Sequence, residues 1–237
     1  MASEELENGQ HQMDTERVAM MRGGGSEPRT SLKVLYFFAG VVRKGDIRSF
    51  MKTTAESRGW SFIMEEIDLL RGGSEHDLSQ STAQNHWIDR IQDYDIIICT
   101  PPCCSHSRAT WANSFGPHPV RSAQLPDGYP WLSNADMIKC RLFSGLVTFM
   151  WNVMRRVHDL QHGQDIIAFA EHPEDLGRIK DGSARDIPAF IWRSTDFLDL
   201  NYGLVVRGLS TVLLCRTDTK TNKVPLKWVV FQCNGHW

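Results

Sequence analysis

Residues 33–40 have the sequence KVLYFFAG, a run of apolar side chains that ends in alanine and glycine. Short apolar runs that end at a turn are typical of strands buried on both faces of a sheet. The runs at residues 61–67 (SFIMEEI), 94–99 (YDIIIC) and 165–170 (DIIAFA) have the same form. The sequence therefore predicts four buried strands, the first over residues 33–38.

Segments compatible with helices separate these strands, at residues 46–58, 82–92 and 136–160. Asp46 is placed to cap the first of them. Strands that alternate with helices predict an α/β fold, with a Rossmann-like, doubly wound and mostly parallel sheet. Near the C-terminus, residues 202–206 and 211–215 predict a β-hairpin whose turn is residues 207–210.

The composition is that of an ordinary globular protein: 237 residues, 41% hydrophobic and 23% charged, with a formal net charge of −2. We expect residues 1–30, which are polar and acidic, to form a disordered tail, and residues 31–237 to form one domain. Without the tail the chain has 23 basic and 22 acidic residues. The domain therefore lacks the strong positive charge of proteins that hold nucleic acid mainly by electrostatics.

The longest nearly apolar run, residues 142–154, has 13 residues and contains Asn152, so it is too short to span a bilayer. The N-terminus is acidic and has no apolar segment, which argues against a secretory signal. Six cysteines are too few for a disulfide scaffold of this length, and we expect reduced thiols. These features predict an intracellular protein that is neither secreted nor embedded in a membrane.

Ligands and catalytic groups of doubly wound sheets lie beyond the carboxyl ends of the strands. Cys103 follows the third strand after two prolines, which stiffen the loop and suit a nucleophile. Glu171 follows the fourth strand, where partial burial would let a carboxyl group keep its proton near neutral pH. A buried thiol without a chemical role is the alternative for Cys103.

The strand ends resemble the motifs of the cytosine-5 DNA methyltransferase family. In the family's order, the chain contains FFAG (37–40), MEEID (64–68), an acid in HDLS (76–79), CTPPCCSHS (99–107) and FAEHP (169–173). A weaker match is LNYGLVVRGLSTVLLC (200–215). The resemblance covers roughly residues 33–215, and its most specific element is the Pro-Pro-Cys segment.

The resemblance implies a fold of the S-adenosylmethionine-dependent methyltransferase type and methyl transfer to C5 of cytosine in DNA. It implies that the Cys103 thiolate attacks C6, that Glu171 contacts N3, and that Arg207 contacts the substrate. The thiol and the carboxylate should then face one cleft that a single base can bridge. For Arg207 the alternative is a solvated arginine in the hairpin.

The resemblance also implies the cofactor S-adenosyl-L-methionine. The residues that would hold it are Phe38, Ala39 and Gly40 in the first turn, Glu66 at the ribose, Asp77 at the adenine amino group, and Pro101. Glu66 has an alternative as an exposed acid at a strand end, and Asp77 as a cap or turn residue.

The chain departs from the family pattern at several positions. Residues 41–43 (VVR) replace a glycine, Cys104 stands where the family has glutamine, and His172 and Pro173 replace Asn-Val. The stretch of residues 116–130 is an additional loop. Together with Trp111 and Trp131, its Arg121 suits phosphate and base contacts, or packing.

Separate target-recognition and final cofactor motifs have no counterpart in the sequence, so we expect a partner or a further domain to select the target. DNA is the expected substrate, RNA is an alternative, and the nucleus is a possible location. A different class of function is a catalytically inactive methyltransferase-like module of a larger or mobile-element protein that binds nucleic acid or a partner.

Two further alternatives concern Cys103. One is a cysteine hydrolase in which His106 or His172 serves as the base. The other is a metal site formed by Cys103, Cys104 and His106. Cys233 and His236 near the C-terminus would be metal ligands only in a longer chain.

Overall fold

The computed structural model describes residues 30–106, 108–111, 118–160, 163–172, 187–198, 211–215 and 228–232, the last two segments by their backbone. The expected tail lies outside these residues, except for Thr30. Arg207, Cys233 and His236 also lie outside them, as does the predicted strand at residues 202–206.

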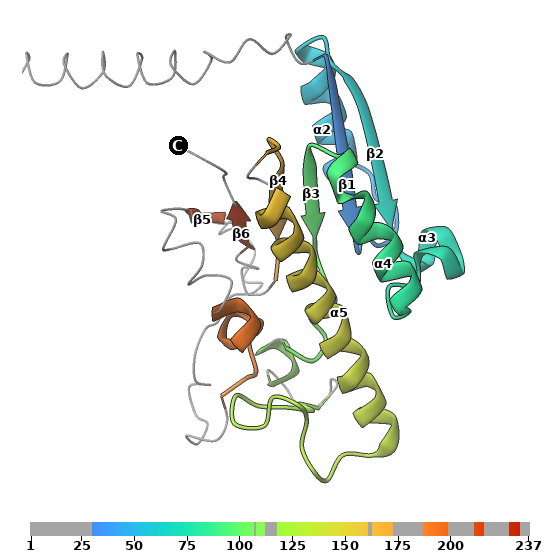
Figure 1. The fold of residues 1–237 in the computed structure, drawn as a ribbon. Coiled ribbons are helices and arrows are strands. Elements are labelled where there is room, and N and C mark those ends of the chain that lie inside the picture. Colours follow the sequence, from blue (N-terminus) through green and yellow to red (C-terminus); the bar gives the residue numbers. More distant parts are fainter. Residues whose placement is uncertain are drawn as a thin grey trace, which may run out of the picture.

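Four parallel strands form the central sheet, in the order β2-β1-β3-β4 (Figure 1). The strands are β1 (Ser31–Phe37), β2 (Ser61–Ile67), β3 (Ile96–Cys99) and β4 (Ile167–Ala170). The register pairs Phe37 with Ile67 and Cys99, and Cys99 with Ala170. The carboxyl ends of all four strands therefore meet at one edge. The predicted α/β class and parallel sheet are confirmed, and the arrangement is compatible with a Rossmann-like fold.

Capping side chains mark the start of the first and the last of the longer helices. Asp46 accepts a hydrogen bond from the Ser49 amide, as predicted, and starts α2 (Ile47–Ser57). Ser133 accepts one from the Asp136 amide, and α5 (Asn134–Leu160) begins two residues earlier than predicted. The remaining helices are α3 (Leu69–Gly72) and α4 (Ser81–Arg90), with short 3-10 turns η1 (Gly73–His76), η2 (Ile91–Asp93), η3 (Arg108–Trp111) and η4 (Ile191–Arg193).

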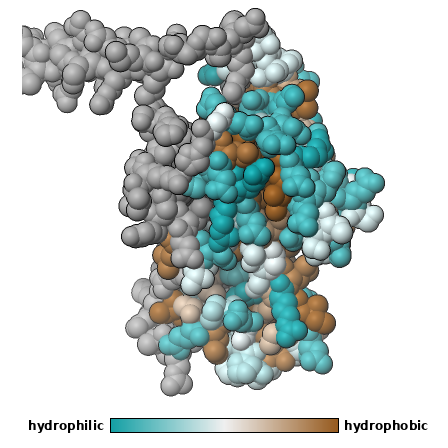
Figure 2. Space-filling view, in the orientation of Figure 1, coloured by the Kyte–Doolittle hydropathy of each residue, from teal (hydrophilic) through white to brown (hydrophobic). Residues whose placement is uncertain are grey.

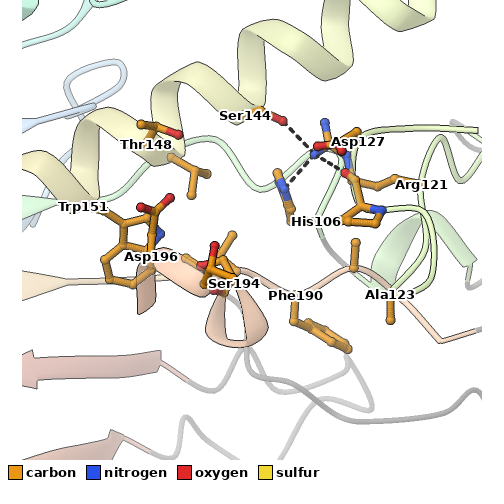
Figure 3. Close-up of a pocket in the computed structure, with 15 residues that line it drawn as sticks. His106, Arg121, Ala123, Asp127, Ser144, Thr148, Trp151, Phe190, Ser194 and Asp196 are labelled. Carbon is orange, nitrogen blue, oxygen red and sulfur yellow. Dashed lines mark hydrogen bonds between the residues drawn. The ribbon is translucent and has the colours of Figure 1, made fainter. Parts of the chain in front are cut away.

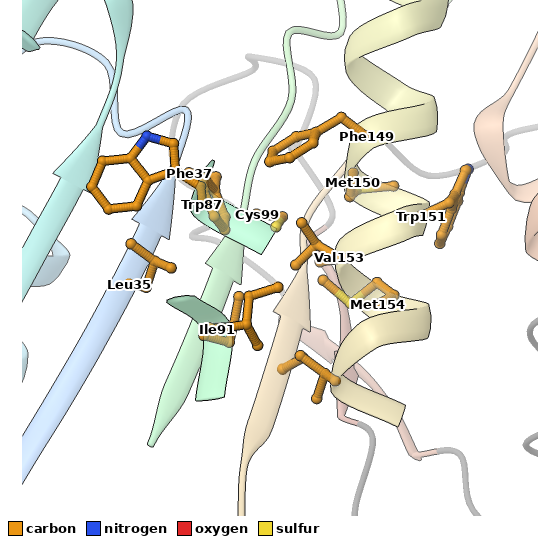
Figure 4. Close-up of a cluster of buried hydrophobic side chains, with 14 of the residues drawn as sticks. Leu35, Phe37, Trp87, Ile91, Cys99, Phe149, Met150, Trp151, Val153 and Met154 are labelled. Atoms are coloured by element: carbon orange, nitrogen blue, oxygen red, sulfur yellow. The ribbon is translucent and has the colours of Figure 1, made fainter. Parts of the chain in front are cut away.

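The larger hydrophobic cluster lies between one face of the sheet and the helices α4 and α5 (Figure 4). The ring of Phe149 on α5 meets that of Phe37 edge to face, with centroids 5.1 Å apart. A smaller cluster on the opposite face joins Val34 and Met64 of the sheet to Ala55 of α2. Burial on both faces explains why the strands are continuous apolar runs.

Residues 211–215 form a strand, as predicted, named β5 (Thr211–Cys215). Its antiparallel neighbour is β6 (Trp228–Gln232), which the sequence patterns did not predict. β6 also lies beside β4 of the central sheet.

Among the described helices, none is both long and apolar enough to cross a membrane. The surface in Figure 2 is largely hydrophilic, with apolar areas in the middle and at the lower end of the view. The most exposed large apolar side chains include Val42, Phe50, Leu70 and Trp131.

Candidate functional site

Cys103 and Glu171 follow neighbouring strands at the same edge of the sheet. The Glu171 amide donates to the Cys99 carbonyl at 2.9 Å, which extends the pairing of β3 and β4 by one residue. Burial raises the pKa of the Cys103 thiol, and the charges of Cys104 and Glu171 raise it further. The carboxylate of Glu171 is thus near enough to influence the thiol of Cys103.

Glu171 lies in a site that favours its protonated form. Burial raises the pKa of its carboxyl group to about 7. No ion pair joins it to the described part of the chain. At neutral pH the group can therefore hold a proton, or give one up, as a general acid requires.

Tyr36 on β1 contacts the loop that leads from β3 to Cys103. Its hydroxyl lies 3.2 Å from the Thr100 hydroxyl, and Thr100 donates to the Phe38 carbonyl at 3.0 Å. Burial raises the pKa of Tyr36, and the carboxylates of Glu171 and Glu66 add to the effect. Tyr36 therefore lies within the field of both predicted carboxylates.

His106 is buried beside the Cys103 loop, with both ring nitrogens engaged. Nε2 lies 2.9 Å from Nη1 of Arg121, and Nδ1 lies 3.2 Å from the Ser105 hydroxyl. Because guanidinium groups only donate, Nε2 accepts and Nδ1 holds the proton. Burial lowers the pKa of His106 to about 3, so the ring is neutral. These contacts argue against His106 as the base of a cysteine hydrolase.

The same contacts argue against the metal site of Cys103, Cys104 and His106. In the described segments, no group of three or more His, Cys, Asp and Glu side chains is arranged to hold a metal ion. His172, the other candidate base, is buried next to Glu171, with its ring centroid 5.9 Å from that of His106.

The turn after β1 contains the predicted cofactor residues Phe38, Ala39 and Gly40. Phe38 and Gly40 have φ angles of +64° and +63°, which turn the chain sharply away from the strand. The Phe38 ring packs against Phe149, with centroids 6.1 Å apart. Phe38 thus anchors the turn in the core, and a ligand at this turn meets backbone atoms.

Two residues after β2 hold this turn in place. Asp68 accepts the Gly40 amide through Oδ2 at 2.9 Å, and Arg71 donates from Nε to the Gly40 carbonyl at 2.5 Å. Asp68 also caps α3 by accepting the Leu70 amide. The turn at the end of β1 is therefore attached to the chain that follows β2.

Glu66, the predicted ribose ligand, is held by two arginines. Its Oε2 accepts from Nη1 of Arg71 and from Nε of Arg48, both at 2.6 Å. Its side chain is 6% exposed. Oε1 accepts no hydrogen bond from the described residues. An acid fixed near the end of a strand has the chemistry of the predicted ribose contact, so the residues present fit the nucleoside part of the expected cofactor.

Asp77 has the turn role that was its alternative. It accepts from the Ser79 amide at 3.0 Å, and hydrogen bonds from Ser79 lower its pKa. Pro101, the last predicted cofactor residue, is buried in the loop after β3. Arg207, the predicted substrate contact, lies outside the described residues.

Of the two roles that the sequence left open for Arg121, phosphate contact and packing, the structure shows packing. The side chain is 2% exposed and donates to the carbonyls of Cys140 and Pro126 and to the Ser144 hydroxyl, at 2.6, 2.9 and 2.9 Å. It fastens its loop to α5. Trp131, in contrast, is 73% exposed and stacks on Tyr129, with centroids 4.9 Å apart.

Sequence reasoning missed Arg48, Arg71, Asp68 and Tyr36. Asp68 and Arg71 stand in the run MEEIDLLRG (64–72), where charged side chains after an apolar strand were a usable signal. Arg48 had no such signal, because it lies 18 residues before Glu66. Comparisons with protein-family models, curated proteins and solved structures found no match for the chain.

Proposed function

We propose that this domain transfers a methyl group from S-adenosyl-L-methionine to C5 of cytosine in DNA. The observation that carries the proposal is the placement of Cys103 and Glu171 after adjacent parallel strands. A thiol and a carboxyl group with a pKa of about 7 are the two groups that this reaction requires.

The Cys103 sulfur forms a bond to C6 of the base, and the thiol proton passes to water. The electron pair of the C5–C6 double bond moves through the ring toward N3, where Glu171 donates its proton. C5 becomes nucleophilic as a result, because the neutral ring is now an enamine. This step uses the protonated form of Glu171, which burial maintains near neutral pH.

The bound cofactor supplies a methyl group attached to a positively charged sulfur. After C5 has taken this methyl group, water removes the proton from C5. The S–C6 bond then breaks, the double bond returns, and Cys103 leaves as thiolate. Glu171 recovers its proton from N3 and the Cys103 thiolate takes a proton from water, so the protein ends as it began.

The residues at the ends of β1 and β2 support binding of the cofactor. Glu66 is oriented by Arg48 and Arg71, and Asp68 and Arg71 fix the Gly40 turn. The antiparallel β5–β6 pair forms a separate two-stranded sheet beside β4, and its presence supports the methyltransferase type of fold.

A cytosine inside a duplex must leave the base stack to reach both groups. The near-neutral domain supplies little general attraction for DNA, so a partner or further domain would select and hold the target. A protein that works on DNA in this way would act in the nucleus, or wherever else its DNA lies.

Two observations favour a second candidate, an inactive module that binds nucleic acid or a partner. The pKa of Cys103 is raised, whereas reactive cysteines have a lowered pKa in most enzymes. Residues 41–43 (VVR) also alter the cofactor turn.

The two candidates differ in covalent chemistry. The protein is incubated with labelled S-adenosylmethionine and an oligonucleotide that contains 5-fluorocytosine, whose C5 carries fluorine in place of the proton that the last step removes. A covalent adduct is expected with the wild type and with Cys104→Ala, and no adduct with Cys103→Ala. If wild type forms no adduct and calorimetry detects no cofactor binding, methyl transfer is ruled out.

A further inference from the structure

A cavity of about 430 Å³ lies between α5, the segment 121–127 and residues 189–196 (Figure 3). Arg121 and His106 lie at one end of it, and Trp151 and Asp196 at the other. His106 belongs to the loop of the candidate nucleophile, because its amide donates to the Cys103 carbonyl at 3.0 Å. The cavity therefore lies beside the Cys103 loop, although neither Cys103 nor Glu171 is among the described residues that line it.

The charges around the cavity do not suit an anion. The terminal nitrogens of Arg121 are used within the protein, by the carbonyls of Cys140 and Pro126 among other acceptors. Two carboxylates, those of Asp127 and Asp196, also line the cavity. Asp196 forms an ion pair with Arg155. A phosphate or carboxylate would meet these acids without a free guanidinium to bind it.

The remaining groups suit a flat, neutral and polar ligand. Asp127 offers a carboxylate near the surface, and Thr148 and Thr195 offer hydroxyl groups. Phe190 and Val147 supply apolar wall. A ligand that fits must donate to a carboxylate, accept from hydroxyls and tolerate apolar contact. Adenine, cytosine and guanine have this chemistry, since each has an exocyclic amino group, and thymine lacks one.

We infer that this cavity receives a second base of the substrate strand, a neighbour of the target cytosine, with its amino group directed to Asp127. The volume is within the range of ordinary ligand pockets and accommodates a nucleobase. The inference rests on the proposed function for the identity of the strand. It assigns part of the target recognition to this domain.

A preference for unpaired DNA follows from this arrangement. Extraction of a base from a duplex costs a few kcal/mol, and the cost is smallest for bases that are already unpaired. Two bases must leave the stack here, one for the catalytic pair and one for the cavity. Single-stranded DNA therefore binds more tightly than the matching duplex.

The test measures binding of the full chain to a single-stranded oligonucleotide of about 16 nucleotides with one central cytosine, by fluorescence anisotropy. Thr148→Trp fills the cavity from an exposed position on α5 and should weaken binding about tenfold or more. Leu142→Trp adds the same side chain to an exposed position on α5 outside the lining and should leave binding unchanged.

A scan with single abasic sites then locates the second base. With the wild type, removing the base at one position beside the cytosine should weaken binding. With Thr148→Trp, removing that base should have no further effect on binding. Thymine at that position should weaken binding to the wild type. Asp127→Asn should reduce this effect of thymine, whereas Asp159→Asn, an exposed control on α5, should leave it unchanged.

The inference would be overturned if removal of a base beside the cytosine did not weaken binding at any position. Equal binding by Thr148→Trp and Leu142→Trp would also overturn it. Adduct formation at Cys103 is measured on the same oligonucleotide. If the scan shows the sensitive position but no adduct forms, the proposed chemistry fails while the cavity assignment stands. An adduct together with a scan that shows no sensitive position supports the chemistry and overturns the cavity assignment.

Discussion

Glu66 and Glu171 stand at the same edge of one sheet, yet their surroundings are opposite. Glu66, near the end of β2, is held by Arg48 and Arg71, each 2.6 Å from one carboxylate oxygen. Glu171, after β4, is half-buried without such a partner in the described chain, and its pKa rises to about 7. Neighbouring charges therefore make one glutamate a fixed acceptor, and burial makes the other a group that can transfer a proton.

The largest expected effect comes from a substitution that removes proton transfer by Glu171. Glu171→Gln keeps the size of the side chain but cannot donate a proton to N3, so the methylation rate should fall by about 10²- to 10⁴-fold. The measurement is single-turnover methylation at saturating cofactor. Glu65→Gln, which alters a half-exposed pair with Arg90, is the control and should retain activity. An unchanged rate in Glu171→Gln would remove Glu171 from the mechanism.

The next effect is the pH dependence of stability. Because the folded state raises the pKa of Glu171 to about 7 from its ordinary 4.5, folded protein keeps this proton while unfolded protein loses it. The contribution to stability is therefore complete below pH 4.5 and is lost as the pH rises to 7, by at most about 1.4 kcal/mol per pH unit.

Urea unfolding of the wild type and of Glu171→Gln at a series of pH values measures this contribution. The difference in unfolding free energy between the two proteins should decline from pH 4.5 to 7 and then remain constant. A difference that does not vary with pH would show that Glu171 ionises as freely in the folded chain as in the unfolded one.

The smallest expected effect comes from a substitution in the ion pairs of Glu66. Arg71→Ala removes hydrogen bonds to Glu66 and to the Gly40 carbonyl, and should weaken binding of S-adenosylmethionine about tenfold to a hundredfold. Calorimetry gives the affinity. Lys52→Ala, which removes an exposed pair with Glu56, is the matched control and should change little. Equal affinities for the two variants would show that the Arg71 contacts do not orient the cofactor site.

Much of the fold was predictable from local patterns. The four apolar runs became strands because the sheet is covered on both faces, and such strands need no alternation of polar and apolar residues. Asp46 starts its helix as predicted. The β5–β6 pairing was not predictable, since the choice of partner depends on which segments meet in space.

The candidate site was predictable in position and not in detail. Parallel strands end at one edge, so Cys103 and Glu171 were expected there from their places in the chain alone. The role of Arg121 was not predictable, because an arginine in a polar loop has the same sequence pattern whether its side chain faces solvent or α5. The cavity beside His106 likewise arises from three segments that are far apart in the sequence.

By itself, the sequence determined the alternation of strands and helices and the residues that end each strand, because apolar runs and capping side chains act over a few neighbouring residues. Only the tertiary structure decided which glutamate is paired with arginines and which has a raised pKa, that His106 is neutral, and that Arg121 is structural. Ion pairing and burial depend on distances in space between residues that the chain separates, and a sequence pattern does not contain those distances.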